Sequence, residues 1–213
     1  MHLLSWIIGI YLKTFLLTLF MAIIRNKKFL AKGHRSIIYT GFLGTKKIVI
    51  KEKNPSSEAI GRIKNEARFL KILNKYKIGP RLLNVKHNSI IYEFVEGDFI
   101  LDFIEKNNKK KIVKMLKDVL RQCFILDKLK INKLEMHHPV KHIIIDKKPV
   151  LIDFERSYYT ENPKNVSQFC QFLMSNSKDL KINRKELIFR VKNYKKRPSK
   201  STFKGILDLI GKI

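Results

Sequence analysis

The chain has 213 residues, which is enough for one sizeable hydrophobic core or for two small lobes. Apolar residues make up 45% and charged residues 30%, as in an ordinary folded protein, but 45 Lys+Arg against 18 Asp+Glu give a formal net charge of +27. This excess favours anionic partners, namely nucleic acid, a phosphorylated ligand or an anionic membrane surface, whereas two cysteines without CxxC or Cys/His spacing exclude a cysteine-based zinc site.

The first element of the chain is an apolar run over residues 3–24 that carries one charge, Lys13. Its length is that of a transmembrane helix, and the basic residues directly after it predict that the rest of the chain faces the cytoplasm. A lysine in the middle of a free span costs about 2.5–3.5 kcal/mol, and Ser5, Gly9 and Lys13 share one helical stripe that could instead pack on protein. We therefore expect a hydrophobic N-terminal helix over residues 1–28, either spanning a membrane or packed.

The next segment is predicted to form strands. Residues 31–41 alternate and are rich in β-branched side chains, which indicates a strand–turn–strand unit. Gly33 lies in the tight turn, where backbone amides could approach a phosphate, and Ser36 could cap that phosphate; a plain hairpin turn explains the pattern equally well. Residues 46–53 predict a third strand, whose apolar run ends at Lys51.

A helix and a strand follow. Residues 56–76 have apolar side chains at helical spacing after a serine N-cap, which predicts a helix that carries Glu66. Gly79–Pro80 ends that pattern, and residues 90–95 predict a strand that stops at Glu96–Gly97.

The second half of the chain predicts two helices, a loop and two short strands. The helices lie over residues 98–106 and 111–129, the loop and first strand over 135–145, and the second strand starts at residue 150 after a turn over 146–149. The last strand leads into Asp153 and Phe154. A carboxylate that follows three apolar residues at a strand end favours a role as a metal ligand.

Taken together, Lys51 on a strand, Glu66 on a helix and Asp153-Phe154 at a strand end resemble the nucleotide site of the protein-kinase-like superfamily. Within it, the chain is similar to small divergent prokaryotic, archaeal-type predicted serine/threonine kinases. The motif LIDFER over residues 151–156 is also similar to that of kinases that phosphorylate lipopolysaccharide core sugars. The resemblance covers residues 30–175.

The resemblance implies an α+β protein with a minimal two-lobed protein-kinase-like fold, a shortened C-terminal lobe and the added N-terminal hydrophobic helix. Residues 29–97 would form the N-terminal lobe and hinge. Residues 98–213 would form the reduced C-terminal lobe and its basic tail. An Ala-Pro-Glu motif is missing from the sequence, so the peptide-docking platform of large protein kinases is largely absent.

The resemblance also implies ATP and Mg²⁺ as cofactors. Lys51 would contact the α- and β-phosphates and Glu66 would hold it there, while the carbonyl of Glu93 and the amide of Val95 would face adenine. The residues implied to bind the nucleotide are Gly33, Ser36, Lys51, Glu66, Glu93 and Val95.

The metal ligands and the catalytic loop follow from the same alignment. Asp153 would bind Mg²⁺, with His142, in the position of the usual asparagine, as a weak second ligand or as a hydrogen-bond donor to a ligand. His137 then occupies the position of the catalytic aspartate and Glu135 that of the preceding histidine. Lys141 lies where a cation can neutralise the transferred phosphate, whereas His137 or Glu135 could orient the acceptor hydroxyl, or His137 could accept its proton.

These features predict an atypical ATP- and Mg²⁺-dependent kinase on the cytoplasmic side of a membrane, associated with it through residues 3–24. Its acceptor would be a protein serine or threonine, or the hydroxyl of a sugar or lipid-linked substrate. One alternative is a pseudokinase, a nucleotide-binding regulatory module without the catalytic aspartate. A basic nucleic-acid-binding protein is the third hypothesis, although the sequence has no aromatic-interleaved basic motif.

Overall fold

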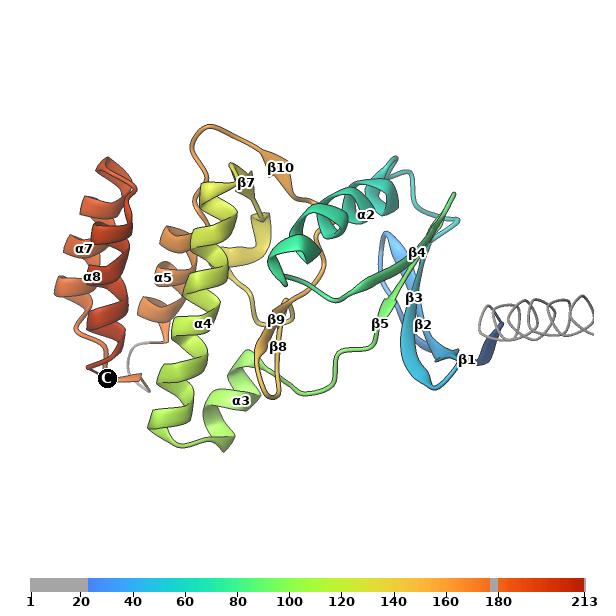
Figure 1. Ribbon diagram of the computed structural model, residues 1–213, viewed down its shortest axis with the longest axis horizontal. Coiled ribbons are helices and arrows are strands. Elements are labelled where there is room, and N and C mark those ends of the chain that lie inside the picture. Colours follow the sequence, from blue (N-terminus) through green and yellow to red (C-terminus); the bar gives the residue numbers. More distant parts are fainter. Residues whose placement is uncertain (1–22, 177–179, 213) are drawn as a thin grey trace, which may run out of the picture. The chain divides into compact units, whose positions relative to one another are not determined.

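A computed structural model describes residues 23–176 and 180–212, and it shows a mixed α+β protein (Figure 1). The chain divides into two compact units. Of the described residues, 23–64 and 81–94 form the first, which we call the sheet unit, and 65–80 together with 95–176 and 180–212 form the second, which we call the helical unit.

The sheet unit is an antiparallel five-stranded sheet in the order β1-β2-β3-β5-β4 (Figure 1). Its strands are β1 (Ile24–Lys32), β2 (Ser36–Leu43), β3 (Lys46–Lys53), β4 (Leu82–Lys86) and β5 (Ser89–Glu93). Ile48, Ile50 and Ile91 form its buried core, because alternate residues of a strand point to the same face and Ile50 pairs with Ile91 across the ladder. The strands predicted over residues 31–41, 46–53 and 90–95 are therefore confirmed, with changed ends.

The expected N-terminal helix does not reach residue 28. Ile24–Lys32 form β1, which pairs with β2, and the ring of Phe29 lies edge-on to that of Tyr39 with 6.2 Å between centroids. Of the apolar run over residues 3–24, only Ile24 lies in this strand. The rest of the run, residues 3–22, lies outside the described residues. Within the described part of the chain, no helix combines the length and the apolarity needed to cross a bilayer.

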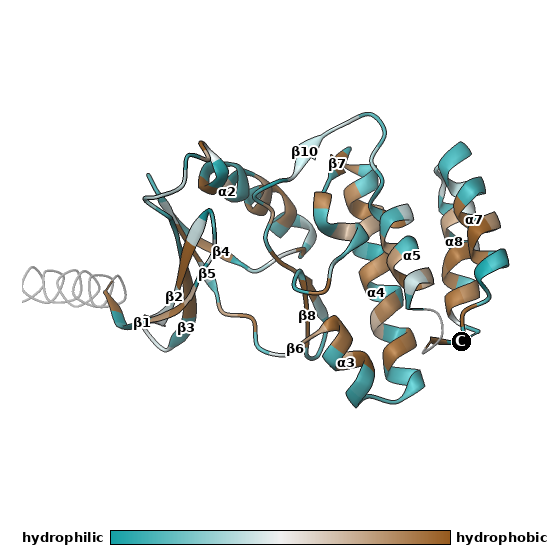
Figure 2. Cartoon of the chain, turned by 180° about the vertical axis from the view of Figure 1, so that it is seen from behind, coloured by the Kyte–Doolittle hydropathy of each residue, from teal (hydrophilic) through white to brown (hydrophobic). Residues whose placement is uncertain are grey.

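The helical unit contains most of the helices and two small sheets. Its elements are α2 (Arg62–Leu73, from Asn65 onward), the 3-10 helix η1 (Asn74–Tyr76), β6 (Asp98–Phe99), α3 (Ile100–Lys106), α4 (Lys109–Lys128), β7 (Ile131–Asn132), the 3-10 helix η2 (Leu134–His137), β8 (Ile143–Ile145), β9 (Pro149–Leu151), β10 (Tyr158–Tyr159), α5 (Asn165–Ser175), α7 (Arg184–Lys196) and α8 (Lys200–Ile210). The apolar side of α4 packs on α5 and α8, and α5 also contacts α7; Figure 2 shows brown, hydrophobic segments along α4, α5 and α8.

Helix α2 starts later than the sequence pattern predicts. It begins at Arg62 rather than near residue 56, because Gly61 has a positive φ of 73° that no helical residue adopts. The part of α2 from Asn65 belongs to the helical unit rather than to the segment 29–97 expected as one lobe. Its apolar side explains this, since the ring of Phe69 lies 5.4 Å from that of Tyr159 in the helical unit.

A three-stranded sheet has the order β6-β8-β9, and its strand β9 directly precedes the segment that contains Asp153. In it Asp98 pairs with Ile145, and Ile143 pairs with Leu151. Gly97 enters this sheet with φ 128°, and a Cβ there would lie 2.4 Å from the carbonyl oxygen of Ile145. Only glycine fits this close approach to β8.

Asp127, near the end of α4, is the polar centre of the helical unit. Its carboxylate accepts hydrogen bonds from the backbone N–H of Asn165 (3.0 Å), the side-chain amide of Asn165 (2.7 Å), the backbone N–H of Val166 (3.3 Å) and the hydroxyl of Tyr194 (2.9 Å). The carboxylate thereby satisfies the first amides of α5 and joins α4 to α7. Burial raises the pKa of Asp127, while these hydrogen bonds act in the opposite direction.

We predict that Asp127→Asn lowers the free energy of unfolding by about 2–3 kcal/mol, because an NH₂ group would face donors that now have an acceptor. Tyr194→Phe, which removes one hydrogen bond, should cost about 1–2 kcal/mol. Urea denaturation of the three proteins at neutral pH measures both. Equal stability of Asp127→Asn and the parent protein would contradict this account.

The same variant tests the pH dependence. The folded state holds the Asp127 proton to a higher pH than the unfolded chain does, so the contribution of Asp127 to stability falls as pH rises through its raised pKa. Asp127→Asn should lack this fall.

Candidate functional site

Asp153 has a backbone conformation that is rare for a residue with a side chain. It follows β9 and adopts φ 63°, in the left-handed region that aspartate tolerates better than most residues but that still costs energy. The preceding amide, of Ile152, donates to the carbonyl of His142 at 3.0 Å and so fixes the approach to Asp153. Conformations of this kind persist where the surrounding structure holds them.

Lys133 stabilises this conformation of Asp153 through buried contacts. Its side chain is fully buried, with 0% exposure, and its Nζ donates hydrogen bonds to the backbone carbonyl of Asp153 and to Oε2 of Glu135, the latter at 3.0 Å. The same Nζ lies 5.1 Å from the centroid of the Phe154 ring. The lysine therefore joins the loop that contains Glu135 to the turn that contains Asp153 and Phe154. Buried lysines are rare unless they have partners, and Lys133 has two, the carboxylate of Glu135 and the backbone carbonyl of Asp153.

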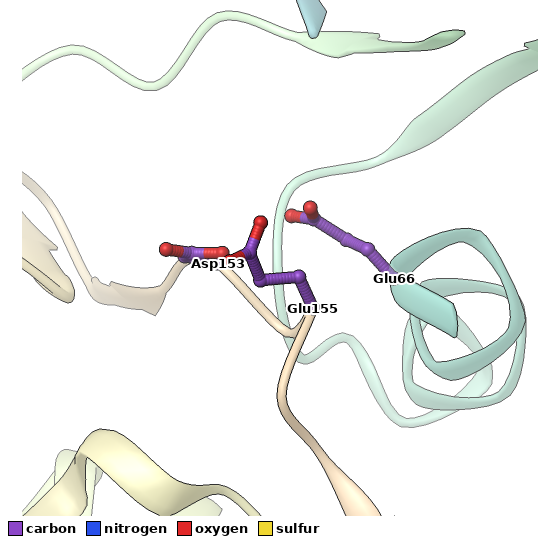
Figure 3. A group of neighbouring side chains, drawn as sticks. All are labelled: Glu66, Asp153 and Glu155. Atoms are coloured by element: carbon purple, nitrogen blue, oxygen red, sulfur yellow. The ribbon is translucent and has the colours of Figure 1, made fainter. Parts of the chain in front are cut away.

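Three carboxylates meet beside this turn. One oxygen each from Glu66, Asp153 and Glu155 lie within 4.8 Å of one another, and Figure 3 shows the three side chains directed toward a common point. Glu66 is 1% exposed and Glu155 is buried. Negative groups brought this close repel each other unless positive charge or hydrogen-bond donors compensate them. Carboxylate oxygens are the ligands that Mg²⁺ and Mn²⁺ prefer.

Helix α2 is attached to the same turn by its neighbouring residue. The side-chain amide of Asn65 donates to the backbone carbonyls of Glu155 at 3.0 Å and Ser157 at 2.9 Å. These bonds fix the position of the helix turn that carries Glu66. The sequence predicted Glu66 on a helix, and it is the tertiary attachment that brings it to Asp153.

The two predicted metal ligands, Asp153 and His142, are neighbours. Nδ1 of His142 lies 3.8 Å from Oδ2 of Asp153. Because His142 directly precedes β8 and Asp153 follows β9, the β8–β9 pairing brings them together. The structure thus places His142 and Asp153 side by side, and Glu155, which was not among the predicted ligands, lies close to Asp153. The sequence feature that could have indicated Glu155 is its position two residues after Asp153 in the motif LIDFER.

The three predicted catalytic residues lie in or after η2 but differ in environment. Glu135 is buried, with Oε1 3.9 Å from Nε of Arg156 in addition to its bond to Lys133. His137 is exposed, and its Nδ1 lies 3.0 Å from the carbonyl of Leu134, which leaves Nε2 as the outward ring nitrogen. Lys141 is exposed in the loop before β8. The environment of Glu135 is that of a structural ion-pair partner rather than of a group that exchanges protons with a substrate.

Asn165 anchors the other end of this loop. Its side-chain oxygen accepts from the backbone N–H of Lys133 at 2.8 Å, and its side-chain nitrogen donates to the carbonyl of Ile131 at 2.7 Å. The first residue of α5 therefore holds the segment from which Lys133 and Glu135 project.

The predicted nucleotide residues of the sheet unit have clear local roles. The amide of Gly33 donates to the carbonyl of Ser36 at 2.8 Å within the turn between β1 and β2, and the roles of Gly33 and Ser36 at a phosphate stay predictions. Asn54, which the sequence analysis did not single out, donates to the carbonyl of Gly33 at 3.1 Å and so fixes the turn. Lys51 is buried in β3.

Along the chain, the predicted hinge residues lie where the sheet unit ends and the helical unit resumes. Glu93 ends β5, and its carboxylate lies 3.1 Å from Nζ of Lys46 and 3.5 Å from a guanidinium nitrogen of Arg81. Val95 is the first residue of the following helical-unit segment. The roles of Lys51, Glu93 and Val95 in binding a nucleotide stay predictions.

Comparison with known proteins adds a single weak similarity. No family model matches the chain. It is 26% identical, over 95 residues, to an uncharacterized protein of Methanocaldococcus jannaschii, in an alignment that covers 45% of this chain and 82% of that protein. This relative brings no activity with it, so the functional argument rests on the chain's own residues.

We predict that Lys133→Met lowers the free energy of unfolding by about 3–5 kcal/mol, because it leaves Glu135 buried without its main partner. The double variant Lys133→Met/Glu135→Gln should recover part of this loss, since the uncompensated charge is removed as well. Chemical denaturation measures both.

The matched control is Lys130→Met, which removes an exposed lysine 3.2 Å from Glu161 and should cost no more than about 1 kcal/mol. A loss in Lys133→Met as small as in this control would show that the buried contacts are not important for stability.

Proposed function

We propose that the chain is an atypical ATP- and Mg²⁺-dependent kinase with a minimal two-lobed protein-kinase-like fold. The observation that carries the proposal is the convergence of Glu66, Asp153 and Glu155 on one point of the helical unit, with His142 beside Asp153. A cluster of oxygen ligands with a histidine suits a divalent cation that neutralises phosphate groups. The order of elements along the chain, with a buried lysine in β3, a glutamate in α2 and an aspartate after β9, supports the same proposal.

In this proposal Asp153 and Glu155 would hold Mg²⁺ on the nucleotide phosphates, with His142 as a further ligand. Lys51 and Glu66 would act as the phosphate-binding pair that the family resemblance implies; they belong to different units, and their pairing stays a prediction. Phosphoryl transfer depends mainly on positioning and charge neutralisation, so it does not require a strong base. Lys141 would supply the cation that stabilises the transferred phosphoryl group.

The acceptor belongs to one of two classes, a protein serine or threonine or the hydroxyl of a sugar or lipid-linked substrate. The reaction is the same in both: the acceptor oxygen forms a bond to the γ-phosphorus, the bond from that phosphorus to the β–γ bridging oxygen breaks, and the acceptor proton leaves through His137 or solvent. ADP is the leaving group.

A pseudokinase is the second candidate function, and the environment of Glu135 favours it. Its carboxylate is paired with buried Lys133 and approached by Arg156, and the position of the catalytic aspartate is taken by exposed His137. In that case the site would bind a nucleotide with Mg²⁺ and act through the bound state, without turnover.

We predict that Asp153→Asn removes Mg²⁺-dependent ATP binding, with at least a tenfold loss of affinity by calorimetry, because a neutral amide is a poor ligand for a hard cation. Glu155→Gln should weaken binding of Mn²⁺ measured by electron paramagnetic resonance without nucleotide. Asp146→Asn, in the exposed turn between β8 and β9, is the matched control and should bind like the parent protein.

Unchanged metal and ATP affinity in both Asp153→Asn and Glu155→Gln would remove the carboxylate cluster from the site. Metal-dependent ATP binding that is lost in Asp153→Asn, together with no γ-phosphate turnover on any acceptor, would select the pseudokinase.

We predict that Lys141→Ala lowers the single-turnover rate at saturating ATP by about tenfold or more, whereas His137→Ala lowers it only a few-fold. Charge stabilisation outweighs base catalysis in a loose phosphoryl-transfer transition state. Both side chains are exposed, so neither change should unfold the protein. Lys147→Ala removes an equally exposed lysine nearby and should leave the rate unchanged; a loss in His137→Ala larger than in Lys141→Ala would assign base catalysis to the histidine.

A further inference from the structure

The outward face of α7 exposes two large apolar side chains. Phe189 is 60% exposed and Ile188 is 40% exposed. They are neighbours on a regular helix whose opposite side packs in the core. That opposite side is formed by Leu187, Val191 and Tyr194, which are buried in the helical unit. The exposed pair therefore contributes nothing to the core.

Lysines surround the exposed phenylalanine. At about 100° per residue, Lys185, Lys192 and Lys196 lie on the same side of the helix as Phe189, opposite the buried residues. All three are exposed, and in Figure 2 α7 carries both hydrophobic and hydrophilic stretches. We call Lys185, Ile188, Phe189, Lys192 and Lys196 the α7 face.

The charge around this face is strongly one-sided. From residue 181 to residue 204 the sequence has ten lysines and arginines and a single acidic residue, Glu186. That one acid is neutralised by Arg190, whose Nε and Nη2 each lie 2.7 Å from its Oε1. The complementary partner must therefore be negatively charged and must also accept apolar side chains.

We propose that the α7 face binds the surface of an anionic lipid bilayer. Phe189 and Ile188 would enter the boundary between headgroups and acyl chains, and the lysines would extend to the lipid phosphates. Single-stranded nucleic acid is bound mainly by aromatic stacking and by arginine, whereas an aliphatic side chain such as Ile188 is better accommodated by acyl chains. Four of the five residues on this face are lysine or isoleucine. The proposal is independent of the proposed kinase activity.

The expected strength follows from the charge. Each lysine near an anionic surface contributes about a fivefold gain in partitioning at physiological salt, and the gain is screened at high salt. Loss of two lysines of the face should therefore weaken binding by roughly 25-fold.

The test uses the full chain with a local probe. Phe189→Cys is labelled with an environment-sensitive nitrobenzoxadiazole, and Lys147→Cys labelled in the same way is the control; Cys123 and Cys170 are fully buried and leave the label to the introduced thiol. Vesicles of phosphatidylcholine alone are compared with vesicles that also contain phosphatidylserine. We expect the emission at position 189 to rise and shift to the blue only with phosphatidylserine and only at low or physiological salt, with no change at position 147.

Flotation of unlabelled variants gives the second measurement. Lys192→Ala/Lys196→Ala should lose roughly 25-fold in partitioning to anionic vesicles, whereas Lys147→Ala/Lys148→Ala, with the same loss of charge, should lose much less. The apolar run over residues 3–24 is present in every variant and forms a constant background.

Three results would overturn the proposal. Equal responses at positions 147 and 189 would show that vesicles do not select this face. No response at position 189 while the protein still floats would place membrane binding elsewhere. A response at position 189 to single-stranded RNA but not to vesicles, lost in Lys192→Ala/Lys196→Ala, would identify a nucleic-acid surface instead.

Discussion

A continuous chain of buried hydrogen bonds connects the helical core to the candidate site. Tyr194 donates to Asp127, Asn165 donates to Asp127, and the oxygen of Asn165 accepts from the backbone of Lys133. The side chain of Lys133 then donates to the carbonyl of Asp153. The position of Asp153 thus depends on residues of α7, α4 and α5.

Such a network is costly to build and rigid once complete. Each buried charge would be strongly destabilising alone, so Asp127 and Lys133 are tolerated because donors and acceptors surround them. Low local dielectric strengthens the same bonds that satisfy them. This rigidity suits Asp153, whose left-handed backbone would relax in a looser setting. The same support holds Asp153 beside the carboxylates of Glu66 and Glu155.

The large positive charge of the chain is distributed between two kinds of position. Lys133 is buried and acts as a structural cation. The lysines of the α7 face remain in solvent, beside Phe189, where they can act only on an external partner. A formal net charge of +27 predicts attraction to anions. Burial determines which basic side chains stabilise the fold and which remain accessible to a ligand.

The sequence by itself determined the α+β class, the strands around Ile48 and Ile91, the long helix α4 and the placement of Asp153 after a strand, because these follow from local periodicity and from glycine and proline positions. It also predicted that His142 and Asp153 belong together. The kinase fold, the nucleotide and the acceptor follow from resemblance alone and stay predictions. Tertiary structure decided the rest: that residues 24–32 pair as β1, that Glu155 lies beside Glu66 and Asp153, and that Lys133 is buried against the carbonyl of Asp153. Local pattern cannot reveal these, because a strand partner, a carboxylate neighbour and the depth of a lysine are set by residues far away in the chain.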